Sequence, residues 1–484
     1  GVNYVNYSNP IDNNSDGFTD LTLQDRISVF NKLNLGKNLS IASRFVYEDR
    51  WGGQMVWNKS FRGGDEVYGE SIYTSRVELF GSYTFNDAAS FQFSFNDHNQ
   101  NSVYGTIHFI ADQTIGFGQF IWNKSIKKHA LLFGAALRYT FYDDNTTATF
   151  DDRLGINRVE KIQLPGVFIQ DEIELSQQQT LLVGLRYDYN SLHGSILTPR
   201  LNYKISNKDQ SSTLRLSMGS GYRVAQVFTE DHAALTGARK VVFVNDLDPE
   251  QSWNANLNYV YKLYLRKGHI LEFDTSLFRT DFLNKIIPDY DTNPNQIIYD
   301  NLSGKSVTQG ASLNFNAVFQ SGLRINLGLT YIDAFIQSEG NKSRPYLTER
   351  FQAVWKVEQK IKESNLTIDF TGNLIGPLKL PLLGELDPRD QFSPTFSIIN
   401  LQLTKVWQNS YELYGGVKNL LNFTPAKNSI ARAFDPFDNG VGFDPNGNVQ
   451  STDENPYALT FDPSYVYASN QGIRLFLGFR WKLN

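Results

Sequence analysis

Apolar and polar residues alternate along almost the whole chain. In the C-terminal segment, for example, Ile473, Leu475, Leu477, Phe479 and Trp481 alternate with Arg474, Phe476, Gly478 and Arg480. About 19 segments follow this pattern, most of roughly ten residues or more, which is the length of a tilted membrane-spanning β-strand. Because successive side chains of a strand point to opposite faces, each segment has one apolar and one polar face. The pattern predicts an all-β, transmembrane antiparallel β-barrel that occupies residues 1–484.

The lengths of the connections also alternate. Short polar turns such as GKN and KESN take turns with long connections, among them Trp51–Asp65, Arg223–Glu250, Ile287–Lys305 and Phe423–Asn470. Outer-membrane barrels have short turns on the periplasmic side and long loops outside, whereas a soluble β-sandwich or propeller has no reason to sort its loops. The alternation places the chain in the outer membrane of a Gram-negative cell, with Asp12–Asp20 in an external loop.

Composition narrows the class further. Aromatic residues make up 14% of the chain and gather at strand ends, as expected for the belts at membrane interfaces. Cysteine is absent, which excludes disulfides and thiolate metal sites, and the net charge of −5 gives no nucleic-acid footprint. Gly1 opens directly into a strand-like segment without a signal peptide, so we expect the numbered chain to be mature or truncated.

Two longer motifs resemble the barrel of TonB-dependent outer-membrane receptors, and the resemblance extends over essentially the whole chain. The first is GSGYRVAQVFTED, residues Gly219–Asp231, followed by NDLDPEQSWNANLNYVYK, residues Asn245–Lys262. The second is YELYGGVKNLLN, residues Tyr411–Asn422, which resembles the penultimate strand of the family. We expect Pro249 and Glu250 to set the start of a strand, and Asn419 to satisfy backbone groups where a strand ends.

The resemblance implies a plugged barrel of ~22 strands. The segments found here, with a partial strand at Gly1–Tyr7, would leave about two strands and the N-terminal plug outside the chain. The family's function would be import of a scarce bulky ligand, such as cobalamin or another corrinoid, or a ferric siderophore. Expected partners are the TonB–ExbB–ExbD complex through the plug, outer-membrane lipid and lipopolysaccharide, and a surface lipoprotein over the long loops. The C-terminus departs from the family, because Trp481 is followed by three further residues.

The stretch IDNNSDGFTD resembles the calcium-binding loop of the family's cobalamin transporters. Candidate oxygen ligands are Asp12, Asn14, Asp16 and Asp20, with Glu48 or Asp49 from the next external loop. Oxygen donors at every second position suit Ca²⁺, and Gly17 permits a sharp turn. The Glu that closes an EF-hand is replaced by Leu23, so affinity would be modest. The alternative is an ordinary turn rich in Asp and Asn.

Candidate ligand-binding residues lie in the two longest external segments; they are Arg223, His232, Phe434, Phe437 and Phe443. Turn chemistry alone also explains the Phe-Asp-Pro repeats that contain the phenylalanines. The six histidines lack metal-ligand spacing, and no catalytic motif can be assembled, so an enzyme is not expected. The alternatives to an importer are a passive porin, an adhesive or structural barrel and, more remotely, a barrel enzyme.

Overall fold

A computed structural model describes residues 1–151, 155–224, 227–230, 239–245, 247–290, 292–293, 295–338, 340–408, 410–445 and 447–482. One large sheet dominates it. Its strands are β1 (Val2–Tyr7), β2 (Leu23–Leu35), β3 (Leu39–Gly53), β4 (Gly69–Thr84), β5 (Ala89–Tyr104), β6 (Ile107–Ile126), β7 (His129–Asp144), β10 (Glu160–Ser176), β11 (Gln179–Asn190), β12 (Gly194–Ser206), β13 (Ser212–Arg223), β15 (Glu250–Leu265), β16 (His269–Phe282), β19 (Lys305–Val318), β20 (Leu323–Ser338), β21 (Asn341–Ser343), β22 (Phe351–Ile361), β23 (Leu366–Ile375), β24 (Phe396–Trp407), β25 (Tyr411–Lys418) and β26 (Arg474–Trp481).

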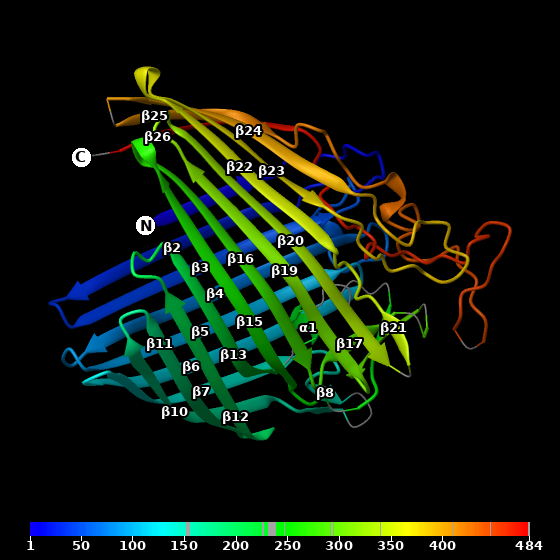
Figure 1. Ribbon diagram of the computed structural model, residues 1–484. Coiled ribbons are helices and arrows are strands. Elements are labelled where there is room, and N and C mark those ends of the chain that lie inside the picture. The colour runs from blue at the N-terminus through cyan, green and yellow to red at the C-terminus, as the bar shows by residue number, and fades with distance from the viewer. Residues whose placement is uncertain are drawn as a thin grey trace.

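The strands of this 21-stranded sheet pair antiparallel in chain order, except that β20 pairs with both β21 and β22. The strands lie side by side at a common tilt and curve into a barrel wall (Figure 1). Two members are short, since β1 has six residues and β21 has three. The remaining strands match the segments found from the alternation, so the predicted antiparallel barrel is confirmed. No plug domain is evident among the described residues, and they include no helix long and apolar enough to cross a membrane.

The alternation places apolar side chains on the outside of the wall and charged ones on the inside. On β11, Val183, Leu185, Tyr187 and Tyr189 are all more than 40% exposed, as residues facing lipid must be. The opposite face of β11 carries Arg186, which pairs with Asp188 at 2.6 Å. A charge inside the barrel keeps water or a partner charge, whereas one on the outer face would lie in hydrocarbon. The lipid-facing residues therefore fix which face of each strand points outward.

The connections alternate as predicted. Short turns join β2 to β3, β10 to β11 and β15 to β16, at the end of the barrel where β26 also ends (Figure 1). The long connections lie at the other end. Two external connections depart from the prediction because they are also short, at 105–106 and 191–193. Short turns thus occur on both sides, and long loops occur only outside.

The sheet has two free edges. Within the described residues, β1 pairs only with β2, and β26 pairs only with β25. Leu475 on β26 is 82% exposed, whereas Leu413 on the adjacent β25 is 39% exposed, because no strand covers one side of β26. A sheet that spans a membrane needs both edges paired, since hydrocarbon offers no hydrogen bonds to backbone groups.

The long external connections form a folded layer, which we call the outer loop layer. Its described parts come from 224–249, 283–304, 376–395 and 419–473. The layer contains α1 (Val227–Glu230), η5 (Lys427–Ser429) and a small sheet of β14 (Lys240–Phe243), β18 (Gln296–Asn301) and β17 (Ile286–Asp289), in that order. Other connections hold β8 (Phe150–Asp151), β9 (Ile156–Asn157), η1 (Lys59–Phe61), η3 (Arg266–Gly268) and η4 (Lys362–Ser364).

An apolar cluster attaches the outer loop layer to the wall. Phe228 of α1, with Ile297 and Tyr299 of β18, packs into one buried cluster with Phe109 of β6 and Tyr142 of β7. These wall strands are separated along the sheet from β13 and β16, where the two loops start. The loops therefore extend across the external end of the barrel to contact β6 and β7. Burial of these aromatic side chains stabilises that arrangement.

Candidate functional site

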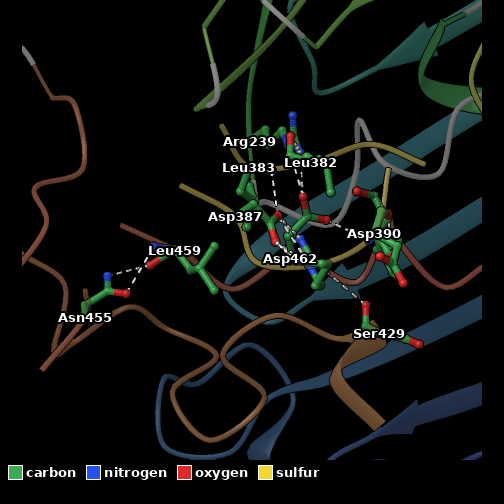
Figure 2. A network of polar contacts seen from close by, with 12 residues as sticks. Arg239, Leu382, Leu383, Asp387, Asp390, Ser429, Asn455, Leu459 and Asp462 are labelled. Carbon is green, nitrogen blue, oxygen red and sulfur yellow. Dashed lines mark hydrogen bonds and ion pairs between the residues drawn. The ribbon is translucent and has the colours of Figure 1, made fainter. Parts of the chain in front are cut away.

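A buried ion pair joins two loops that are far apart in sequence. Nη2 of Arg239 lies 2.8 Å from Oδ2 of Asp462, and the side chains are only 2% and 1% exposed (Figure 2). The guanidinium also donates to the carbonyl of Leu382, and it lies 5.1 Å from the centre of the Tyr290 ring. Four segments of the outer loop layer thus meet at one arginine.

A second buried ion pair lies in the same network. Arg389 and Asp387 are 2.7 Å apart and almost fully buried, and the Arg389 guanidinium lies 4.4 Å from the centre of the Tyr465 ring. Its Nη1 donates to the carbonyl of Ser429 at 3.5 Å. The Asp387 carboxylate also accepts a backbone hydrogen bond from Leu383. Buried ions require this density of partners, so the network holds the four segments in one geometry.

The predicted ligand-binding residues have different surroundings. Phe437 belongs to an aromatic cluster with Tyr68, Phe18 and Phe461, and its ring lies 6.0 Å from that of Tyr68. It packs inside the loop layer. Phe434, by contrast, is 79% exposed. Its ring lies 4.9 Å from the Arg432 guanidinium.

The other ligand candidates are spread along the layer. Phe443 is half-exposed and bridges to Val449 in a small hairpin. Arg223 ends β13 and forms an ion pair with Glu250 of β15 at 2.7 Å, so it also closes the ladder between these strands. His232 lies outside the described residues. The structure thus leaves Phe434 as the candidate with the most accessible ring.

The calcium candidates in the first external loop form a hydrogen-bonded turn. The Asp12 carboxylate accepts from the backbone N–H groups of Ser15 and Gly17, and Asp16 accepts from Phe18 N–H. The Asn14 amide donates to Asp16 at 2.9 Å. Asp and Asn satisfy backbone groups in this way in many turns, so these contacts explain the composition without a metal.

Asp20 is the least satisfied member of this loop. One oxygen accepts from the backbone N–H of Asn13, and the other is buried without a partner in the described structure. Burial, together with repulsion from Asp12 and Asp16, raises the pKa of the Asp20 carboxyl despite the hydrogen bond from Asn13. A cation near these three carboxylates would offset both effects.

Glu48 and Asp49 are held by basic side chains. Glu48 pairs with Arg50 at 2.8 Å and with Arg26 at 3.8 Å, while Asp49 pairs with Lys59 at 2.5 Å. No group of three or more Asp, Glu or His side chains in the described part of the chain has metal-binding geometry. The calcium hypothesis stays a prediction that rests on the loop sequence and on Asp20.

The sequence did not single out Arg344, which lies in the external connection between β21 and β22. Arg344 lies 5.9 Å from the ring centre of Phe392, which is 41% exposed, and donates to the carbonyls of Thr348 and Pro377. Burial and then the nearby Arg350 lower the pKa of the Arg344 guanidinium. Within the described residues Arg344 has no ion-pair partner. Nothing in the local sequence marks it, because its neighbours come from another loop.

The raised pKa of Asp438 predicts that the loop layer responds to pH. Burial raises the pKa of its carboxyl from 3.8 to about 6, against a hydrogen bond from Phe461 N–H. A raised carboxyl pKa stabilises the folded loop below the unfolded value of 3.8, and this contribution is lost as pH rises through about 6. We therefore expect higher hydrogen-exchange protection factors around 460–462 at pH 5 than at pH 7.5. Asp438→Asn should abolish the difference; equal pH dependence in this variant would contradict the assignment.

The wall and the loop layer together define a large outer-membrane barrel with a structured external ligand face. Residues 1–420 match the family described as TonB dependent receptor-like, beta-barrel. The chain belongs to this family, as the two motifs predicted. Its relatives are receptors rather than enzymes, which agrees with the expectation from sequence.

Two curated relatives illustrate the similarity. The iron-regulated outer membrane virulence protein of Vibrio cholerae is 25% identical over 316 residues, which is 61% of this chain and 46% of the relative. The ferrienterobactin receptor of Escherichia coli is 23% identical over 346 residues, which is 65% of this chain and 44% of the relative. The chain thus spans about half the length of the curated relatives that it matches.

Solved structures share the fold. The siderophore receptor PirA of Acinetobacter baumannii aligns with a TM-score of 0.63 at 14% identity, over 83% of this chain and 67% of its own. The ferric enterobactin receptor PfeA of Pseudomonas aeruginosa aligns with a TM-score of 0.60 at 15% identity, over 86% of this chain and 67% of its own. At these identities the likeness shows the fold alone.

Proposed function

We propose that this chain is the barrel of a TonB-dependent importer for a ferric siderophore. The observation that carries the proposal is the pairing of Arg344 with Phe392, an accessible aromatic ring of the outer loop layer. Phe434 adds a second exposed ring, whose neighbour Arg432 is itself paired with Asp435. Guanidinium groups bind anions, and exposed rings stack on aromatic ligands. An iron complex of a catecholate siderophore offers both features, and receptors named for enterobactin are among the relatives and the structural neighbours.

The energy source in this proposal is the inner membrane. The partners are the TonB–ExbB–ExbD complex, which acts through a plug, and the outer membrane with its lipopolysaccharide. An open barrel of this width would leak, so import requires a plug that is displaced only when ligand is bound. A surface lipoprotein over the outer loop layer is a further proposed partner.

Uptake of labelled iron tests the siderophore proposal. The full-length receptor, expressed in cells without other siderophore receptors, should take up radioactive iron as ferric enterobactin, and deletion of TonB should abolish uptake. Arg344→Ala should weaken binding by roughly 10-fold or more, because a charge-assisted contact contributes about 1.5–3 kcal/mol. Arg266→Ala, in the periplasmic turn η3, is the matched control. Normal iron uptake without TonB would refute the mechanism, and unchanged affinity in Arg344→Ala would refute this site.

A corrinoid is the second candidate cargo, and the loop Asp12–Asp20 is the observation that favours it. If the loop binds calcium, the ion orders it before the ligand arrives and so lowers the entropic cost of binding. Cobalamin binding should then weaken in EGTA and in Asp16→Ala, with a calcium dependence in the ~10⁻⁴–10⁻³ M range. Lys37→Ala, in the periplasmic turn after β2, serves as the control. Cobalamin affinity that ignores both EGTA and Asp16→Ala would leave the loop as a plain turn.

A further inference from the structure

The barrel wall has a notch at its external rim between β12 and β13. The ladder between these strands ends at Arg200 and Gly219. Beyond this point β12 pairs only with β11, as far as Gly194, and β13 pairs only with β15, as far as Arg223. Pro199 lies where the β12–β13 ladder stops, and proline has no N–H to donate to a ladder. The two strands therefore separate near the rim.

A cavity of about 210 Å³ occupies this notch. The polar residues that line it come from both strands and from the adjoining loops; they are His193, Ser195, Tyr222, Asp248, Gln251 and Asn284. Sites for drug-sized ligands measure ~300–1,000 Å³, so this cavity has room for a single small ring. Neither Lys nor Arg is among the described residues lining it, so a phosphate group is not its natural occupant.

The lining has the hydrogen-bonding capacity of a site for hydroxyl groups. Amides of Gln251 and Asn284 offer both donors and acceptors, Asp248 offers a carboxylate, and Tyr222 offers an aromatic ring. Nε2 of His193 is buried and has no hydrogen-bond partner in the described structure. An unpaired polar atom costs free energy, and a hydroxyl supplied by a ligand would remove that cost. Burial also lowers the pKa of His193, so the imidazole is neutral.

The walls of the cavity are held in place before any ligand binds. The Asn190 side chain accepts from the backbone N–H groups of Leu192 and His193, and it is 2% exposed. Asn301 accepts from Asp248 N–H and donates to the Asp248 carbonyl. Both segments that frame the cavity are thus fixed by buried or paired amides, which reduces the entropy lost on binding.

The cavity lies just above the aromatic belt of the wall. Tyr187 and Tyr189 of β11 and Trp253 of β15 point outward, each more than 40% exposed. The Tyr187 hydroxyl is 2.9 Å from Oγ of Ser195, one of the lining residues. Such belts mark the boundary between hydrocarbon and headgroups. The zone directly above it holds the sugars of the outer-leaflet glycolipid.

We propose that the notch between β12 and β13 binds one neutral sugar ring of the outer-leaflet glycolipid. The site lies in the wall, apart from the loops proposed for cargo, so it would anchor or orient the receptor in its membrane. The same chemistry would accept a sugar free in solution, and the experiment separates these two sources.

The test uses full-length receptor in detergent, freed of lipopolysaccharide. The probes are lipid-free core oligosaccharide released from the host's lipopolysaccharide by mild acid, lipid A alone, and free hexoses. We expect saturation-transfer NMR to show binding of the oligosaccharide. His193→Ala and Gln251→Ala should each weaken it about tenfold, which corresponds to one lost hydrogen-bonding group. Leu192→Ala, an exposed neighbour in the same turn, should bind as the parent does.

Each result of this experiment either supports or overturns the sugar site. Binding of oligosaccharide that both variants weaken supports the proposal, and binding of hexoses but not of oligosaccharide supports the cavity with solution sugars as the source. Binding of lipid A alone, or no loss in either variant, would overturn it. Heat-resistant mobility on gels shows that each variant is folded. Iron uptake by the same variants should remain normal, so this result is independent of the cargo proposal.

Discussion

Replacing Arg239 with methionine is expected to loosen the outer loop layer while the barrel stays intact. The substitution leaves the Asp462 carboxylate, which is 1% exposed, without a charged partner. Breaking one side of a buried ion pair costs about 3–5 kcal/mol, which is comparable to the stability of a whole loop. Hydrogen exchange should therefore speed up at Ala431 and Asp462, whose backbone groups bond to each other. Uptake of the ferric siderophore should also fall in this variant, because the loop layer is loosened.

The double variant Arg239→Met with Asp462→Asn separates charge from packing. It removes the uncompensated charge and keeps an acceptor for the Ser464 N–H, so most of the lost protection should return. Glu412→Gln is the control, because it breaks the Arg480–Glu412 pair, whose arginine is 57% exposed. Exposed pairs contribute only about 0–1 kcal/mol. Equal losses in Arg239→Met and Glu412→Gln would show that the buried network does not hold the layer together.

Leu257→Arg is expected to destabilise the barrel itself. Leu257 is the eighth of the 16 residues of β15, and it pairs with Leu216 and Leu277 on the outer face. A guanidinium at this depth lies in the centre of the hydrocarbon, which costs about 2–4 kcal/mol. The midpoint of denaturant unfolding in lipid vesicles should fall accordingly.

The next residue provides the matched control. Asn256 precedes Leu257 and points into the lumen, where Ser217 is its partner on β13. Asn256→Arg therefore adds the same charge at almost the same height in water, and the unfolding midpoint should change little. If both variants lost the same stability, the assignment of outer and inner faces to β15 would be wrong.

The fold was predictable because the apolar residues of each strand indicate which of its two faces contacts lipid. Shifting the pairing of a strand by two residues leaves the same side chains facing outward. Shifting it by one residue would bring Arg186 or Asp188 into lipid. The alternation therefore fixes the outward face of a strand whatever its partner strand. The strand termini also carry local signals. Asn419 has a positive φ of 53° and bonds both the N–H and the carbonyl of Phe423, as its motif suggested.

The loop layer was much less predictable, because its contacts are not local. Phe434 and Phe437 belong to the same short motif, yet one is exposed and the other packs on Tyr68 from a different loop. Arg239, Arg344 and Arg389 look like ordinary loop residues until distant segments surround them. The Asp- and Asn-rich sequence of the first external loop fits either a calcium site or a turn, because carboxylates that can bind an ion can also accept hydrogen bonds from backbone N–H groups.

The sequence distance between the loops has a consequence for the order of folding. The strands of the wall pair with their neighbours in the chain, so hairpins can form one after another. Within the outer loop layer Arg239 contacts Asp462, 223 residues away, and Asn13 of the first external loop donates to the carbonyl of Gln471 in the layer, 458 residues away. These contacts require the first and last loops to be on the same side already. We therefore expect the loop contacts to be the last part of the molecule to assemble, after the wall strands have paired.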